Sequence, residues 1–572
     1  MNDIRRTILW VIFAFSMVLL WDKWQIHNGK PATFFPTPAA ATATPPAAQP
    51  TDVPAVTATA NPGDVPGNNA PAEAAIAREK VTIASDVLRL TLDNQGGTLV
   101  HAELTQYADH VDRNKPFVLF DQSSSRIYLA ETGLIGGSFP THNTPMQLMP
   151  GARELADGAN ELQVRFESAP VNGVKLAKTY TLKRGAYDVA VKHEVVNESG
   201  AVVNPQLYLQ LKRDGNAPEG ESNAMYSTFT GPAVYSHEKK YQKVDFEDIA
   251  KGKTDFVTSS TDGYVAMVQH YFASAWLLAD GTQRDNFARK VGDNLYTAGQ
   301  IIPLGAVQPG ETKAVEAKLF AGPQLEKTLE ATYPGLELVK DYGWFTILAK
   351  PLYWLLDKLH SFLGNWGWSI VALVLLLKIA FYWLNAKAYA SMAKMKSINP
   401  RIMEMRERLK DKPQQMQQEM MRIYREEKVN PMGGCLPIMV QIPVFIALYW
   451  VLLSSVEIRH APWILWITDL SAKDPLFILP LLMTLSSLLQ TALNPVPPDP
   501  MQAKMMWIMP LIFSVMFFMF PAGLVLYWLT NNILSIAQQW VINTRMGVPP
   551  QFNLPNFKKA DAAVTDVKAK KK

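Results

Sequence analysis

Six apolar stretches dominate the pattern of hydrophobic and polar positions, one near the N-terminus and five after residue 365. They cover residues 8–20, 366–385, 435–456, 475–493, 506–520 and 522–542. A helix needs about 20 apolar residues to cross a hydrocarbon core of about 30 Å, and several stretches reach that length. The pattern therefore predicts six transmembrane helices. The last two stretches meet at the tight turn Phe520-Pro521-Ala522-Gly523, which predicts an antiparallel pair.

A different pattern fills residues 80–335. Apolar and polar side chains alternate in runs such as 87–92, 187–191 and 207–211, and turns rich in Gly and Asn separate these runs. Alternation with a period of two is typical of strands that bury one face. We predict a large all-β sandwich domain.

Between residues 336 and 363 the apolar positions recur at steps of three and four, which is typical of a helix. Pro351 divides this segment, and we expect the helix to begin near it after an irregular lead-in. Two interpretations stay open. The helix lies in the membrane interface, or it packs against the β domain.

The N-terminal region consists of a short apolar segment and a linker. Two arginines precede the apolar run, and no small-residue cleavage site follows it directly. We expect residues 1–25 to form an uncleaved transmembrane signal anchor, with a cleaved signal peptide as the alternative. Residues 26–79 are rich in Ala, Pro and Thr, a composition that predicts a flexible tether.

The distribution of charge indicates the topology. The net charge of +4 over 572 residues argues against a nucleic-acid binder. The segment 386–432 holds eleven Lys and Arg residues, the segment 457–474 holds two, and the tail 546–572 ends in lysines. The positive-inside rule then places the first segment and both termini in the cytoplasm and the β domain on the other side.

The basic segment 386–432 has the pattern of a helical hairpin. Apolar residues at steps of three and four form a seam on each arm: Met395, Ile398, Ile402, Met405 and Leu409, facing Met416, Met420 and Ile423. Asn399-Pro400 and Lys412-Pro413 are expected to begin helices. The Met-rich face is either the packing seam of the hairpin or a client-binding surface. The basic outer face suits lipid headgroups, ribosomal RNA or a targeting factor.

Lys378 is the strongest candidate for a functional residue. It lies inside the second apolar stretch, where a lysine costs about 2.5–3.5 kcal/mol on insertion scales. The other apolar stretches contain no Asp or Glu, so no ion-pair partner is evident and a water-filled cavity best accommodates the charge. The alternative is that the side chain reaches the cytoplasmic headgroups, because Asn385 and Lys387 follow within about two turns.

Polar residues in the other stretches are candidates to line such a cavity. With Lys378 we assign Gln441, Gln490, Thr530 and Asn531 to a polar groove. For each residue alone, hydrogen bonding between helices is the simpler role. Together they favour a wetted groove among the helices.

Catalytic and metal-binding patterns are missing from the sequence. It has no phosphate-binding glycine loop, no paired metal-ligand motif and one cysteine, Cys435. We expect no enzyme, no cofactor and no metal. Two rival hypotheses are a small-solute transporter, for which the expected internal repeats are lacking, and a membrane-anchored carbohydrate enzyme, for which one anchor would suffice.

Four segments resemble a known family. They are GNWGWS at 364–369, NPMGGCLPIMVQIPVFIALYWVL at 430–452, DLSAKDP at 469–475 and FPAGLVLYW at 520–528. These segments resemble the YidC/Oxa/Alb family of membrane protein insertases, and the order of anchor, β domain and five-span core resembles its Gram-negative members.

The resemblance implies a function and partners. Members insert and help fold inner-membrane proteins, so the implied location is a bacterial inner membrane with residues 80–335 periplasmic. Implied partners are nascent membrane-protein clients, the Sec translocon, SecDF, ribosomes and lipids, with no DNA and no cofactor. The resemblance also implies a groove open to cytoplasm and lipid, with a basic residue that is usually Arg; Lys378 occupies that position. The family's β domain is related in shape to sugar mutarotases.

Overall fold

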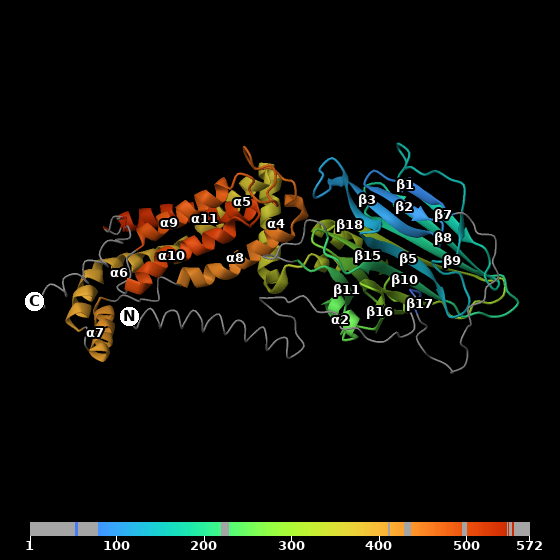
Figure 1. Ribbon diagram of the computed structural model, residues 1–572, viewed down its shortest axis with the longest axis horizontal. Coiled ribbons are helices and arrows are strands. Elements are labelled where there is room, and N and C mark those ends of the chain that lie inside the picture. The colour runs from blue at the N-terminus through green and yellow to red at the C-terminus, as the bar shows by residue number, and fades with distance from the viewer. Residues whose placement is uncertain are drawn as a thin grey trace, which may run out of the picture. The chain divides into compact units, whose positions relative to one another are not determined.

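The computed structural model describes residues 52–54, 78–218, 228–409, 412–427, 436–494, 500–545, 547 and 552–553. The predicted N-terminal anchor lies outside the described residues, as do most of the tether and of the C-terminal tail. The described chain consists of a β domain followed by a helical core (Figure 1).

Two antiparallel sheets form the β domain, each with nine strands among the described residues. The first sheet contains, in spatial order, β1 (Lys80–Ala84), β2 (Leu88–Asp93), β3 (Thr98–Ala108), β4 (Pro116–Gln122), β5 (Ile127–Ile135), β10 (Gln206–Asp214), β17 (Leu295–Pro303), β16 (Arg284–Gly292) and β13 (Ser259–Ser260). The second contains β12 (Lys240–Lys243), β11 (Gly231–Ser236), β14 (Tyr264–Val268), β15 (Phe272–Leu278), β18 (Thr312–Pro323), β9 (Asp188–Asn197), β8 (Val174–Lys183), β7 (Glu161–Ser168) and β6 (Met146–Leu148). The predicted sandwich is confirmed.

Alternation of side chains explains how the two sheets pack. Along β7, for example, every second residue from Leu162 to Ser168 is buried, whereas β14 and β15 are buried along their whole length. The main core joins residues of both sheets, such as Leu209 of the first and Val191 of the second. A short helix, α2 (Phe246–Lys251), lies between β12 and β13, and another, α3 (Glu326–Thr332), follows the last strand, β18.

The helical core follows the last strand. Its elements are η1 (Leu336–Val339), η2 (Gly343–Phe345), α4 (Thr346–Leu363), α5 (Trp366–Ala380), α6 (Tyr382–Arg408), α7 (Pro413–Glu426), α8 (Leu436–Ser454), η3 (Val456–Ile458), α9 (Ile478–Leu493), α10 (Pro500–Phe517) and α11 (Ala522–Arg545). Buried side chains of α4, α5, α8, α9 and α11 share one hydrophobic cluster. The side chain of Asn365 caps α5, and the Asp474 carboxylate accepts the backbone N–H of Leu479 at the start of α9.

The helix predicted near Pro351 begins earlier than expected. It starts at Thr346 and contains Pro351 in its second turn, so the expected start is wrong, while η1 and η2 form the irregular lead-in. The buried face of α4, with Leu352 and Leu356, packs against α5 and α8. Lys327 on α3 also forms an ion pair with Asp357 of α4, at 2.8 Å. The placement of α4 in a membrane interface stays a prediction.

The apolar stretch 366–385 is not one continuous helix. It breaks at Phe381, and α5 meets the first part of α6, up to Met395, at an angle of 68°. By length and composition this bent pair is long and apolar enough to cross a membrane, and none of the described helices is so by itself. Neither glycine nor proline stands at the break. The residue pattern therefore does not predict the helix break at Phe381.

The predicted helical hairpin is formed by α6 and α7 (Figure 1). Its seam buries four apolar side chains, with the predicted methionines packed around them: Ile398, Ile402, Met405 and Ile423. The second helix begins at Pro413, as expected. The helix start expected at Asn399-Pro400 is wrong, because α6 already begins at Tyr382 and Pro400 lies in its interior. The Met-rich face is thus the packing seam of the hairpin.

The seam generates a stability prediction. Ile402 is 1% exposed in the seam, whereas its neighbour Met403 is 52% exposed. Ile402→Ala should therefore destabilise the hairpin by about 2–5 kcal/mol, because it leaves a cavity, whereas Met403→Ala should change stability by less than about 0.5 kcal/mol. Hydrogen exchange of the amides in α6 and α7 measures both. Equal exchange in the two variants would contradict the seam.

Candidate functional site

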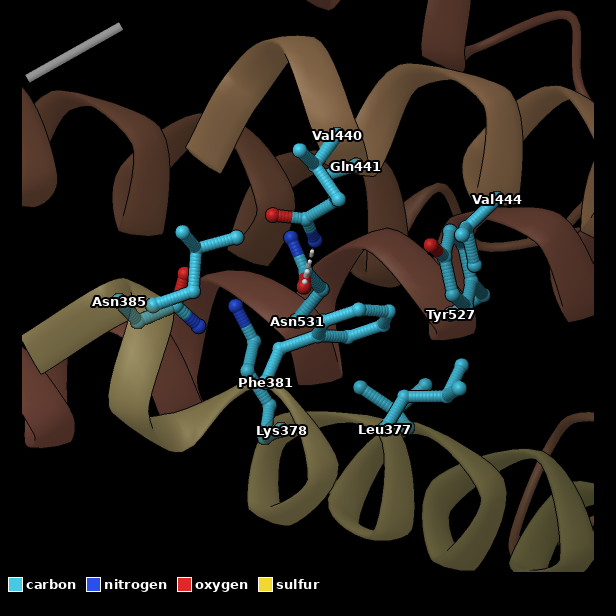
Figure 2. A pocket seen from close by; sticks show the side chains of 11 residues that line it. Leu377, Lys378, Phe381, Asn385, Val440, Gln441, Val444, Tyr527 and Asn531 are labelled. Atoms are coloured by element: carbon cyan, nitrogen blue, oxygen red, sulfur yellow. Dashed lines mark hydrogen bonds between the residues drawn. The ribbon is translucent and has the colours of Figure 1, made fainter. Parts of the chain in front are cut away.

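A small cavity opens among the core helices around Lys378 (Figure 2). It contains about 20 Å³ of free space, which is about enough for one water molecule. Residues of α5, the Phe381 break, α6, α8 and α11 line it: Val374, Leu377, Lys378, Phe381, Leu384, Asn385, Val440, Gln441, Val444, Tyr527 and Asn531. The cavity is therefore narrower in this conformation than the expected wetted groove.

The charge of Lys378 meets neutral polar groups. Its half-buried ammonium donates a hydrogen bond to Ser535 Oγ at 2.7 Å, and that hydroxyl donates to the backbone oxygen of Asn531. The sequences of α5, α8, α9, α10 and α11 contain no Asp or Glu. The lysine is thus held by a hydroxyl rather than by a carboxylate. Figure 2 shows its side chain directed into the space between Asn385 and Asn531.

The break at Phe381 positions two of the polar residues. Lys378 precedes the break on α5 and Asn385 follows it on α6. Because the chain turns by 68° between them, both side chains face the same cavity although they belong to different helices. The N–H of Phe381 bonds the carbonyl of Leu377 and closes the last turn of α5.

A second pair of polar residues connects α8 with α11. Gln441 Nε2 donates to Asn531 Oδ1 at 2.7 Å (Figure 2). Tyr527 lies one turn before Asn531 on α11 and lines the same cavity. Pro443 lies inside α8 two residues after Gln441, where it has no N–H to bond the carbonyl of Met439.

The structure gathers three of the five residues that the sequence assigned to the groove. Lys378, Gln441 and Asn531 line the cavity, whereas Gln490 on α9 and Thr530 on α11 do not. Thr530 is adjacent to Asn531, and neighbouring residues on a helix point about 100° apart. Gln490 is half-buried.

Polar residues of α9 and α11 instead form a separate contact. Asn532 Nδ2 lies 2.9 Å from Ser487 Oγ and 3.3 Å from Ser486 Oγ. Further along, Gln539 Nε2 donates to Asn494 Oδ1 at 3.1 Å. These bonds connect the two helices in the way expected of polar residues between transmembrane segments. By sequence alone, all the polar residues of these stretches are candidates for one groove. In the structure some of them line the cavity, and others connect α9 with α11.

Two polar residues of the cavity, Asn385 and Tyr527, are not among those that the sequence assigns to the groove. The first follows the apolar core of its stretch, and the second lies within the segment FPAGLVLYW. Spacing offered a signal for both, because Asn385 follows Lys378 by seven residues and Tyr527 precedes Asn531 by four. The same spacing is common on lipid-facing surfaces, so it gains meaning only once the break at Phe381 is known.

Comparison with known proteins identifies the family. The family model of the YidC periplasmic domain matches residues 80–355, and that of the 60Kd inner membrane protein matches residues 358–548. A membrane protein insertase YidC of Cupriavidus metallidurans is 56% identical over 95% of this chain and 98% of its own length. The chain belongs to the YidC family of membrane protein insertases.

Other members agree with this assignment. The membrane protein insertase YidC of a Janthinobacterium species is 51% identical over 96% of this chain and its full length. A solved structure of an active YidC insertase covers 81% of this chain at 18% identity, with a TM-score of 0.36. At that score the likeness adds nothing to the sequence relationship.

Membership of the YidC family establishes what the chain does in outline. It is a membrane protein insertase of the inner membrane that acts on nascent membrane-protein clients, and it is not an enzyme. Its β sandwich is the periplasmic domain of the family. The resemblance noted in the four sequence segments is confirmed.

The contact between α9 and α11 generates a second stability prediction. Asn532→Ala removes the hydrogen bonds to Ser486 and Ser487 and should destabilise this YidC family member by about 0.6–1.7 kcal/mol. Ile533→Ala, at the neighbouring exposed position, serves as the control and should have a smaller effect. Unfolding in mixed detergent micelles, followed by tryptophan fluorescence, measures both variants. A larger effect of the Ile533 substitution would contradict the contact.

Proposed function

We propose that the cavity around Lys378 is the client groove, open to the cytoplasm and to lipid. The observation that carries this proposal is the half-buried ammonium of Lys378, which has a hydroxyl partner and lies among side-chain amides. A cation in such a place attracts an acidic group that enters the cavity. Asn385, Gln441, Tyr527 and Asn531 offer uncharged hydrogen-bonding partners to a polar segment.

The outer surfaces of the helices that line the cavity are strongly apolar. Leu375, Leu376 and Ile379 on α5 and Met439 and Ile442 on α8 are all exposed. Such surfaces are expected to contact lipid tails. An apolar client segment can then slide into lipid along these helices while its polar flank occupies the cavity.

Burial of the client segment supplies the free energy for insertion. Each Leu, Ile, Phe or Val gains about 0.3–0.6 kcal/mol at the bilayer centre. The membrane potential adds about 2.3 kcal/mol per charge for each 100 mV when an acidic flank moves outward. The cavity shortens the path over which polar groups lose their water, and no cofactor takes part.

The topology that fits this mechanism has six spans. Residues 1–25 form the anchor, the core 364–545 supplies five spans, and both termini and the hairpin lie in the cytoplasm. The eleven basic residues of segment 386–432, against two in segment 457–474, support this orientation. The β domain, with residues 80–335, lies in the periplasm after the tether 26–79.

We further propose partners for the cytoplasmic surfaces. The hairpin and the basic tail 546–572 meet the ribosome, and the protein works alone or beside the Sec translocon and SecDF. On the hairpin, Arg401 is paired with Glu426 and Glu427 at 3.0 Å. These pairs reduce the net charge of one flank, so the tail supplies the denser positive charge.

The groove proposal predicts a charge-specific effect at Lys378. Lys378→Leu should lower insertion of a client with an acidic translocated flank by about tenfold, equivalent to ~1.4 kcal/mol. Its neutral-flank partner should be inserted normally. Lys378→Arg should retain activity on both clients, because the charge is preserved. Insertion yield in liposomes, at equal protein level and without nucleotide, measures each pair.

Lys387→Leu provides the matched control. This exposed lysine lies beyond the cavity, with its ammonium 3.7 Å from the ring centre of Trp383. Its loss changes the net charge by the same amount and should leave both clients unaffected. If Lys378→Leu inserts the acidic-flank client as well as the neutral-flank client, the charge of Lys378 has no role in insertion.

The topology predicts opposite labelling of two exposed positions. Val111, 76% exposed in the β domain, and Met421 on α7 can each be replaced by cysteine in a Cys435→Ser background. An impermeant thiol reagent should label Val111→Cys in intact spheroplasts and Met421→Cys only after lysis. The reverse order would overturn the orientation.

A further inference from the structure

The first sheet has a recess on the face that points away from the sandwich core. Along β10, Leu207, Leu209 and Leu211 belong to the main core, so the alternate residues Tyr208, Gln210 and Lys212 face the other way. Glycines stand opposite two of these residues on the neighbouring strands. Gly133 of β5 pairs with Tyr208, and Gly299 of β17 pairs with Gln210.

These glycines are required by the close approach of their neighbours. A Cβ on Gly299 would lie 2.2 Å from the carbonyl oxygen of Leu209, and one on Gly133 would lie 2.5 Å from the Tyr208 hydroxyl. Both distances are well inside van der Waals contact. The floor of the recess therefore has no side chain at these two positions, because the Tyr208 hydroxyl and the backbone of the neighbouring strand take that space.

Buried polar side chains surround this floor. Glu131 and His142 are 3% and 4% exposed, and Gln210 is fully buried. Gln210 Nε2 donates to Glu131 Oε2 at 2.7 Å, and Lys212 Nζ lies 3.6 Å from Glu131 Oε1. The Tyr208 hydroxyl lies 2.6 Å from His142 Nδ1. Burial of polar groups is costly unless they have partners, and here Gln210 Oε1 is buried with no partner among the described residues.

Asp52, from the tether, occupies the recess. Its Oδ2 lies 3.0 Å from Lys212 Nζ and 3.2 Å from His142 Nε2. The Tyr208 hydroxyl accepts the backbone N–H of His142 and has its own proton to donate to Nδ1. If Nδ1 accepts that proton, the His142 ring is assigned the tautomer with its own proton on Nε2. The Nε2–H group then donates a hydrogen bond to the Asp52 carboxylate. The hydrogen bond from His142, followed by the influence of Lys212, holds the pKa of the Asp52 carboxyl well below its usual range.

The backbone of the same segment is recognised as well. The carbonyl oxygen of Asp52 accepts from Gln210 Nε2 at 3.1 Å and from Arg289 Nη2 at 3.0 Å. The Val53 side chain packs against the apolar cluster of Ile135, Tyr208 and Ile301. Pro54 is buried. Carboxylate, backbone carbonyl and apolar side chains thus each have a complementary partner.

A metal ion is a poorer explanation of the same cluster. The ligand atoms of Asp52, Glu131 and His142 lie within 4.8 Å of one another, which is compatible with metal binding. The Lys212 ammonium, however, lies within 4 Å of both carboxylates. It supplies the positive charge that a metal would bring.

We propose that this recess is a peptide-binding pocket for an extended Asp-Val-Pro segment, and that Asp52-Val53-Pro54 of the tether is its resident ligand. The sequence supports a preference for this tripeptide, because the tether contains it twice, at 52–54 and at 64–66. The pocket selects a carboxylate through Lys212 and His142 and an extended backbone through Gln210 and Arg289.

Binding of a free peptide to the full chain tests the pocket. A fluorescent peptide with the sequence of residues 47–58 is titrated with the parent and with an Asp52→Asn/Asp64→Asn variant, both in nanodiscs. Because the variant lacks the competing carboxylates, it should bind the peptide at least about tenfold more tightly than the parent. A peptide with Asn in place of its Asp should bind the variant at least about tenfold more weakly. In this control the substitution is in the peptide and not in the protein. Weaker binding of the Asn peptide therefore cannot result from misfolding of the β domain.

A crosslink within the chain provides the second measurement. With Cys435→Ser, the pair Val53→Cys and Ile301→Cys should form a disulfide under mild oxidation, at a rate that falls about tenfold on adding Asp52→Asn. Ligands held by a tether experience effective concentrations of the order of mM, so a pocket too weak for the free peptide still shows this effect. The proposal is overturned if the Asn peptide binds as well as the Asp peptide. It is also overturned if no peptide binds at about 1 mM and the crosslinking rate is unchanged.

Discussion

The cost of removing a charge from water, when no opposite charge is at hand, governs the helical core. The sequences of α5 and α8 to α11 contain no acidic residue, and in the described part of the chain Lys378 donates to the Ser535 hydroxyl in a cavity lined by side-chain amides. Such partners are weaker than a carboxylate, and they leave the positive charge uncompensated. The arrangement therefore gives up some stability, and under the proposed function it attracts an incoming acidic group. A buried ion pair at the same place would have ended that attraction.

The β domain satisfies its buried charges in the opposite way. Glu131 and Asp52 share Lys212, and the amide of Gln210 binds both the Glu131 carboxylate and the Asp52 backbone. One face of the first sheet thus becomes a polar network that is completed by a residue from far upstream in the chain. The two halves of the molecule therefore differ in how they hold buried charge. In the β domain the charged side chains of the network are paired, which favours one geometry, whereas in the proposed client groove Lys378 has no carboxylate partner among the described residues.

Sequence patterns predicted the sandwich and the hairpin seam, because both rest on local periodicity, and they singled out Lys378 as one costly residue, which lines a cavity. They failed where geometry depends on contacts between distant segments. Phe381 breaks a helix without glycine or proline, and Pro400 is accommodated inside α6 because that helix has already begun. Thr530 and Asn531 differ by one position in sequence, yet only Asn531 lines the cavity. The pairing of Asp52 with Lys212 spans 160 residues and no local pattern encodes it.

Because α6 extends far from the break at Phe381, a small rotation at the break would move the far end of the hairpin over a long distance. Helix α6 has 27 residues, which at about 1.5 Å per residue is about 40 Å from the break at Phe381 to its far end. A rotation of only about 10° at the break would carry that end through ~7 Å. Near Phe381 the same rotation would change the distance between Asn385 and Lys378 by only a small fraction of that displacement. A large movement of the far end of the hairpin would thus correspond to a small change in the cavity.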